Sequence, residues 1–184
     1  HMTWHPDGFF FKLGVLDFAG GTVVHMSAGW AAFASALFFK SRSTGGLVPA
    51  RITYVILGTA LLWFGWLGFN AGSALSANSL AVAALATTTT ASAAAAFTWV
   101  IFDAVRGRKP SAMGACIGAV VGLVAITPAA GFVSIPHSLI IGIVAALVSN
   151  MVVEWRSRTS IDDTLDVFPC HGVGGMVGMV LTGV

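Results

Sequence analysis

Charged residues are scarce in this chain of 184 residues: only 9% are Asp, Glu, Lys or Arg, whereas 57% are hydrophobic. A soluble globular domain carries about 25% charged residues, so the composition excludes a soluble enzyme. The formal net charge of +2 is too small to indicate a nucleic acid or an acidic partner. The composition instead predicts an all-α membrane protein built as a bundle of apolar helices.

Cysteine is scarce too, with only Cys116 and Cys170 in the chain. Both lie in apolar stretches, and we expect them to be buried packing thiols. Cys170 and His171 are adjacent, but neighbouring residues of an α-helix point about 100° apart, and few further ligands are available. We therefore expect neither a metal ion nor a cofactor.

Three long runs without Asp, Glu, Lys or Arg define the predicted spans: residues 18–39, 52–102 and 110–153. A helix needs about 20 apolar residues to cross the hydrocarbon core. The second run is divided by small polar residues at 72–79, and the third by two prolines within 127–137. With a last apolar stretch, the sequence predicts six helices, at approximately 17–40, 50–72, 78–104, 110–128, 136–156 and 166–184.

Basic residues lie on alternate connections between these helices. Eight of the nine Lys and Arg residues fall in the loops near 40–51, 103–110 and 154–166. Cytoplasmic loops of membrane proteins carry such an excess of positive charge, so we predict that these three loops are cytoplasmic and that the amino terminus is outside. The expected location is the cell membrane, crossed several times.

Two histidines lie inside predicted spans, each eight residues after an aspartate and four before a glycine: Asp17, His25 and Gly29, then Asp163, His171 and Gly175. An ionisable side chain within a span is by default a functional-site hypothesis. The two segments would enter the membrane from opposite faces, so the repeated spacing predicts inverted-topology repeats that bring both histidines near the midplane. Each aspartate can also cap its helix.

Other residues have structural interpretations. The small-residue patterns at 68–72, 114–122 and 174–178 predict close helix packing. The threonines at 87–90 are expected to bond to carbonyls of their own helix.

Four segments carry a resemblance to one family: residues 17–25 (Asp-Phe-Ala-Gly-Gly-Thr-Val-Val-His), 65–73 (Gly-Trp-Leu-Gly-Phe-Asn-Ala-Gly-Ser), 125–132 (Ala-Ile-Thr-Pro-Ala-Ala-Gly-Phe) and 166–175 (Asp-Val-Phe-Pro-Cys-His-Gly-Val-Gly-Gly). In this order they resemble the ammonium transporter family (Amt/Mep/Rh). The resemblance implies that the chain corresponds to the fifth through tenth of the family's eleven transmembrane helices. We expect further helices in the natural polypeptide.

The resemblance also implies roles for individual residues. His25 and His171 match the family's paired pore histidines, Trp66 a pore-lining tryptophan and Phe69 a gating phenylalanine. Ser73 and Trp4 match the external recruitment site, and Asp17 an aspartate needed for ammonium handling or for the local fold. The implied partners are ammonium or ammonia, two further copies in a homotrimer, and a nitrogen-regulatory protein or a fused signalling domain.

Alternatives stay open from the sequence alone. Trp66 and Phe69 have a plainer interpretation as packing or lipid-facing aromatics, and Asp17 has one as a helix cap, a role that can coexist with contact to the ion. At the level of function, the leading interpretation is ammonium transport. The second is an ammonium sensor of the same fold coupled to a signalling output, and the third is an electroneutral gas channel of the Rh type.

Overall fold

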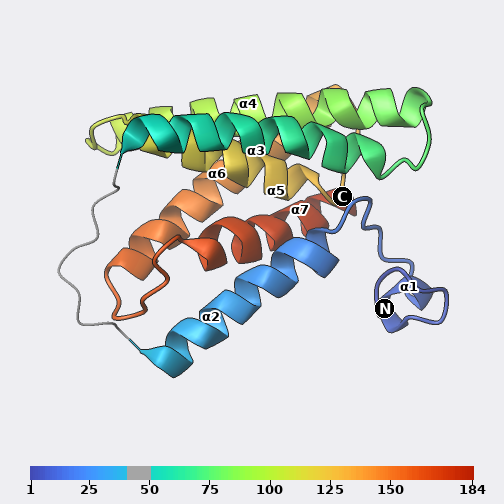
Figure 1. Ribbon diagram of the computed structural model, residues 1–184, viewed down its shortest axis with the longest axis horizontal. Helices are drawn as coiled ribbons and strands as arrows, with labels where there is room; N and C mark the ends of the chain where they lie inside the picture. Colours follow the sequence, from blue (N-terminus) through green and yellow to red (C-terminus); the bar gives the residue numbers. More distant parts are fainter. Residues whose placement is uncertain (41–50) are drawn as a thin grey trace.

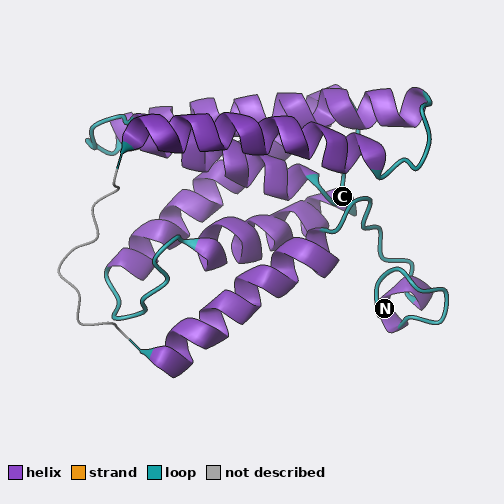
Figure 2. Ribbon diagram, in the orientation of Figure 1, coloured by secondary structure: helices purple, strands orange, loops and turns teal. Residues whose placement is uncertain are grey.

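The computed structural model describes residues 1–40 and 51–184. All regular secondary structure in these residues is helical (Figures 1 and 2). Two short π-helical turns, η1 and η2, lead directly into α-helices. In chain order the elements are α1 (Phe9–Lys12), η1 (Gly21–Met26), α2 (Ser27–Phe39), α3 (Ile52–Gly72), α4 (Ser79–Val105), α5 (Ala112–Ile126), α6 (Ile135–Ser157), η2 (Phe168–Val173) and α7 (Gly174–Thr182).

Four helical stretches in the described residues are long and apolar enough to cross a membrane: Gly21–Phe39, Ile52–Gly72, Ser79–Val105 and Ile135–Ser157. Two further apolar stretches are shorter, Ala112–Ile126 and Phe168–Thr182. The sequence predicted full spans at 110–128 and 166–184. The first of these ends early because Pro128 has no N–H to continue the helix, and the second begins late because residues before Phe168 form an irregular turn.

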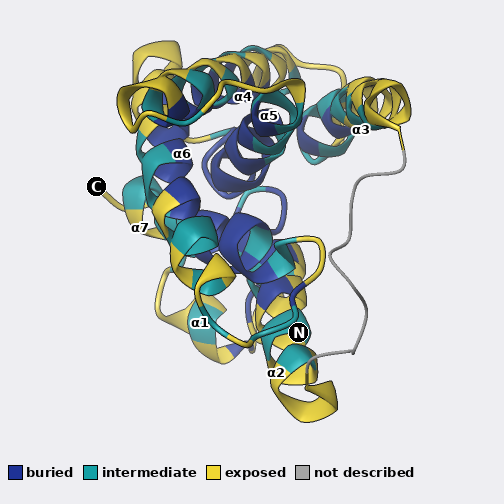
Figure 3. Ribbon diagram, turned by 90° about the vertical axis from the view of Figure 1, so that its left-hand side faces the viewer, coloured by how far each residue is buried: buried dark blue, intermediate teal, exposed yellow. Residues whose placement is uncertain are grey.

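Small side chains fill the centre of the bundle. Helix α4 packs against α3, α5 and α6, and most of its buried residues are small: Ala84, Thr87, Thr88, Ala91, Ser92 and Ala95. Figure 3 shows that buried residues concentrate on α5, whereas α2 and α3 expose long apolar stretches. Gly118 and Gly122 let α5 approach α4, because an added Cβ would meet the backbone of Ala95 and Ala91. The predicted packing at 114–122 is therefore present.

The glycine pattern on α3 behaves differently. A Cβ added at Gly68 or Gly72 would meet nothing within 4 Å in the described chain. The predicted close packing of this face is therefore absent from the described residues. The threonine prediction is confirmed for Thr87, Thr89 and Thr90, which donate to carbonyls of their own helix. Thr87 also donates to the Ala130 carbonyl at 2.8 Å, and Thr88 instead accepts from Asn70 on α3 at 3.0 Å.

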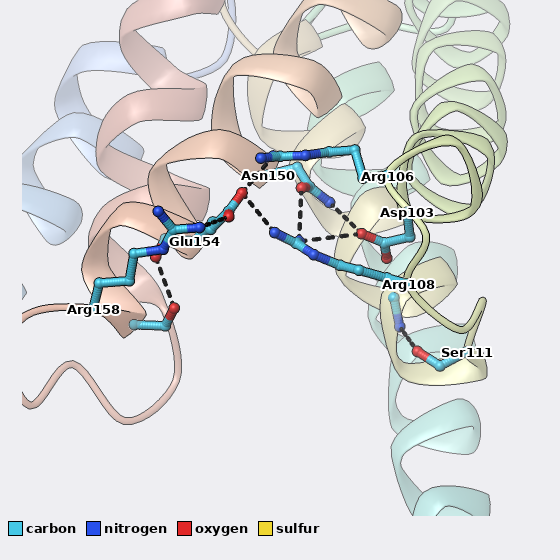
Figure 4. A network of polar contacts seen from close by, with 9 residues as sticks. Asp103, Arg106, Arg108, Ser111, Asn150, Glu154 and Arg158 are labelled. Atoms are coloured by element: carbon cyan, nitrogen blue, oxygen red, sulfur yellow. Dashed lines mark hydrogen bonds and ion pairs between the residues drawn. The ribbon is translucent and has the colours of Figure 1, made fainter.

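Ion pairs link the end of α6 to the connection that follows α4 (Figure 4). Glu154, near the end of α6, pairs with Arg106, Arg108 and Arg158. Deeper in the same cluster, the amide of Asn150 donates to the Asp103 carboxylate at 3.0 Å. The connections after α4 and α6 therefore lie at the same end of the bundle, the left-hand end in Figure 1. Residues 41–50 of the first predicted cytoplasmic loop lie outside the described residues.

The two histidine segments cross with their backbones almost in contact. Gly29 on α2 faces Gly172, and an added Cβ at Gly29 would collide with the Gly172 backbone. In the other direction, Gly175 faces the first segment, where an added Cβ would lie 3.1 Å from the Gly21 carbonyl and 3.3 Å from the His25 Cβ. Only glycine leaves room at position 29, whereas a side chain at position 175 would require its neighbours to shift by a few tenths of an ångström.

We predict that Gly29→Ala destabilises the full-length protein by about 1–3 kcal/mol, because the added methyl group meets backbone that cannot rotate away. Thermal unfolding of the purified protein in detergent measures this change. Gly58→Ala is the matched control, since an added Cβ at Gly58 meets nothing within 4 Å in the described chain. Equal melting temperatures for the Gly29→Ala variant and the unmodified protein would contradict the predicted crossing.

Candidate functional site

A pair of histidines occupies the crossing of the two segments. The Nδ1 atoms of His25 and His171 lie 3.3 Å apart, and the two rings are tilted by 39°. The pair forms a hydrogen bond only if one Nδ1 carries a proton and the other does not. Two neutral imidazoles in opposite tautomers satisfy this requirement. The Nε2 atom of His25 is buried and has no hydrogen-bond partner among the described residues.

Each histidine turn begins at an aspartate that accepts hydrogen bonds from its first N–H groups. Asp17 accepts from Gly20 at 2.9 Å, from Gly21 at 2.6 Å and from Thr22 at 2.9 Å. Gly20 has φ 119°, a backbone conformation that residues with a Cβ rarely adopt.

Asp163 does the same for η2, accepting from Val167 at 3.0 Å and from Phe168 at 2.7 Å. A carboxylate at a helix amino terminus satisfies free N–H groups and complements the helix dipole. Both aspartates therefore have the geometry of a cap, one of the two roles that the sequence left open for Asp17.

Aromatic side chains enclose the first histidine. Trp66 stacks on the His25 ring with centroids 5.0 Å apart and planes 15° apart, and Phe69 meets the same ring edge-on at 6.1 Å. The Trp66 indole N–H donates to the Thr127 hydroxyl at 3.0 Å, and that hydroxyl donates to the Leu123 carbonyl at 2.8 Å. Sequence reasoning missed Thr127, which lies 61 residues from Trp66.

Two cavities meet at the histidine pair. One, of about 460 Å³, is almost wholly apolar and is lined by His25, Trp66, Phe69 and His171, among other residues. The second, of about 150 Å³, is lined by His171 on one side and by Cys116 and Cys170 on others. His171 therefore lines both hollows, whereas His25 lines only the larger one. The thiols, which we expected to be packing groups only, also line the smaller hollow.

Two of the residues predicted for recruitment, Trp4 and Ser73, donate hydrogen bonds to backbone carbonyls. The Trp4 indole N–H donates to the Asp17 carbonyl at 2.8 Å, which attaches the amino-terminal segment to the first cap. The Ser73 hydroxyl donates to the Phe69 carbonyl at 2.9 Å, so its oxygen lone pairs stay available to accept. The structure thus links Trp4 to Asp17 and Ser73 to Phe69.

The long apolar helices define a multi-pass helical membrane protein, and the paired histidines place two polar side chains inside its apolar bundle. Comparison with known proteins agrees: the profile of the Ammonium Transporter Family matches residues 1–184. A putative ammonium transporter of Methanothermobacter thermautotrophicus is 49% identical over 184 residues, which are 100% of this chain and 45% of that protein. The chain belongs to the ammonium transporter family, a family of transport proteins rather than enzymes.

Solved structures share the fold. The crystal structure of Saccharomyces cerevisiae Mep2 aligns with a TM-score of 0.92 and 42% sequence identity, over 100% of this chain and 42% of the Mep2 chain. A structure described as a sensor Amt protein aligns with a TM-score of 0.88 and 31% identity, over 98% of this chain and 48% of that one. The chain thus spans less than half the length of these relatives.

We predict that Asp17→Ala lowers the unfolding free energy of the full-length protein by roughly 2 kcal/mol, because three N–H groups lose their acceptor. The melting temperature in detergent reports the loss. Asp7→Asn serves as the control, since the Asp7 side chain is 77% exposed and contacts only Lys12 and His5 among the described residues. If both variants melt like the unmodified protein, Asp17 is not a cap.

Proposed function

We propose that the full-length protein transports ammonium across the cell membrane, recruiting the ion at an outer aromatic and serine site and passing ammonia, with or without a separate proton, through an apolar pore. The observation that carries this proposal is the 3.3 Å contact between His25 and His171, where His171 lines both the larger, apolar cavity and the smaller one. Trp4, Ser73 and Asp17 belong to the recruitment end, and Trp66 and Phe69 line the way to the histidines.

The chemistry of ammonium suits these groups. The ion offers four N–H donors and a positive charge, which aromatic faces such as those of Trp66 and Phe69 attract. Moving an intact ion through a dry pore is very unfavourable. Deprotonation removes most of that barrier, and neutral imidazoles then accept and donate hydrogen bonds to ammonia. Histidine is also the side chain best suited to relay a proton near neutral pH.

The proposal also covers the internal symmetry of the chain, its orientation in the membrane and its oligomeric state. The two capped histidine turns are related as inverted-topology repeats, and the chain supplies six of the family's eleven transmembrane helices. The end that carries Arg106, Arg108 and Arg158 faces the cytoplasm, following the distribution of basic residues. We further propose a homotrimer with one pore in each subunit, open to control by a nitrogen-regulatory protein.

A second candidate function is ammonium sensing. It is favoured by the alignment with the sensor Amt protein, whose fold this chain shares with a TM-score of 0.88. In that case the same histidine pair and aromatic residues would bind ammonium and report it to a signalling domain.

Current recordings on a solid-supported membrane separate the two functions. The full-length protein is reconstituted in liposomes of two sizes and given an ammonium pulse, with a pH-sensitive dye in the lumen. Transport predicts a saturable current whose decay time scales with lumen size, or, for ammonia alone, a lumenal pH change without current. A brief transient that is independent of lumen size, without a pH change, would overturn transport and favour the sensor.

We predict that replacing either pore histidine by an acidic residue, as in His25→Asp or His171→Glu, changes ion selectivity and not only the rate. A carboxylate at this point stabilises intact cations, so the ratio of potassium to ammonium flux should rise by about tenfold or more. Ion fluxes into proteoliposomes measure this ratio. Unchanged exclusion of potassium in both variants would count against a pore at the pair.

His137→Gln is the matched control for these variants. His137 lies at the start of α6, where it is exposed and hydrogen-bonded to Ser134 at 2.7 Å. It lines neither of the two cavities that meet at the histidine pair. Both fluxes should therefore stay as in the unmodified protein.

A further inference from the structure

The residue that leads into the second histidine turn has an unusual backbone conformation. Asp166 has φ 51°, in the left-handed region, where Asp and Asn are the side chains best tolerated after glycine. Its N–H donates to the Asp163 carbonyl at 3.1 Å, and its carbonyl accepts from Cys170 at 3.0 Å. The backbone at Asp166 therefore determines the direction in which η2 begins.

The side chain of Asp166 is held by an arginine from another helix. Arg156, in the last turn of α6, donates from Nε at 2.9 Å and from Nη2 at 2.5 Å to one carboxylate oxygen of Asp166. Both side chains are largely buried, with 21% and 18% exposed. Hydrogen bonds between two charged groups are stronger than neutral ones, so this ion pair ties the turn to the body of the bundle.

Burial raises the pKa of the Asp166 carboxyl, and the charge of Asp163 acts in the same direction, while the hydrogen bonds and the charge of Arg156 oppose the rise. Loss of the guanidinium would therefore leave a carboxyl that is easier to protonate. Replacement of either Arg156 or Asp166 by a neutral residue would therefore remove the ion pair.

The first histidine turn needs no such arginine, because its cap is more complete. Asp17 accepts from three N–H groups, whereas Asp163 accepts from two. The start of η2 has one cap bond fewer, and the Arg156–Asp166 ion pair supplies a second attachment. A hydrogen-bonded pair such as His25 and His171 tolerates only small displacements, since functional groups must be held to within about 0.5 Å.

We propose that Arg156 and Asp166 are positioning residues for the pore: their ion pair holds the left-handed turn before η2 and thereby sets the spacing of the two imidazoles and the selectivity for ammonium. This inference rests on the proposed transport function. Neither residue contacts the histidines directly; both act through the turn that carries His171.

The test compares three variants of the full-length protein. Asp166→Asn removes the charge but keeps a side chain that tolerates the left-handed backbone, and Arg156→Gln removes the other partner. The third, Arg156→Lys, keeps the charge with a different donor geometry. Glu154→Gln is the matched control, because Glu154 lies on the same end of α6 and pairs with three arginines, but it holds the connection after α4 and not η2.

Ammonium and potassium fluxes are measured in proteoliposomes. We expect Asp166→Asn and Arg156→Gln each to lower the ammonium-to-potassium flux ratio by about tenfold, since misplacement of a functional group by about 1 Å can change rates by that much or more. The double variant should match the worse single variant, because the pair acts as a unit. Arg156→Lys should recover part of the ratio, and Glu154→Gln should leave it unchanged.

A flux ratio that stays constant in Asp166→Asn and Arg156→Gln would overturn the positioning role, even if total flux fell. So would an equal loss of ratio in Glu154→Gln, because the effect would then belong to the helix end in general.

A second readout does not depend on transport. The ¹⁵N signal of His171 Nδ1, assigned by comparison with His171→Gln, should shift in Asp166→Asn and stay in place in Glu154→Gln. If the unmodified protein carries no flux, the proposed function fails, and this signal alone decides the positioning role: a shift upholds it and an unchanged signal overturns it.

Discussion

The contact between two glycine-flanked helical turns is the constraint on which the rest of the structure depends. Because Gly29 and Gly175 carry no side chain, the backbones of the two histidine segments approach until the imidazoles lie within hydrogen-bonding distance. The aspartate eight residues before each histidine fixes where the turn starts. The same spacing therefore produces the same geometry in both segments. The aspartate caps the start of the turn, the histidine projects toward its counterpart, and the glycine lies where the two backbones cross.

Around this crossing the chain keeps full charges at the ends and neutral groups in the middle. The ion pairs of Glu154 lie where the helices finish, whereas Trp66, Phe69 and the imidazoles form the interior surface. An apolar surround makes an unpaired ion very unfavourable. Ammonium differs from potassium in that it can leave its charge behind as a proton. Under the proposed transport function, a neutral interior would therefore favour ammonium over potassium.

Composition and charge distribution were sufficient to predict the helices, because lipid allows few alternatives to a helical span. Paired histidines at equal spacing also predicted that the two imidazoles lie close together. What the sequence did not reveal were contacts between distant residues, such as Thr127 with Trp66 and Arg156 with Asp166, since periodicity carries no information about which helices meet. The open glycine face of α3 shows the converse: a packing pattern does not identify its partner.

The lining of the larger cavity bears on the choice between transport and sensing. Among the described residues, those that line it contribute two imidazoles, aromatic rings and aliphatic groups, and no carboxylate. A carboxylate would hold a cation strongly, whereas aromatic faces contribute about 0.5–2 kcal/mol each. Weak contacts let a substrate leave on either side, and conduction requires binding that is favourable enough to enter yet weak enough to release. A sensor gains from tight binding, so this lining supports the proposed transport function over the proposed sensing function.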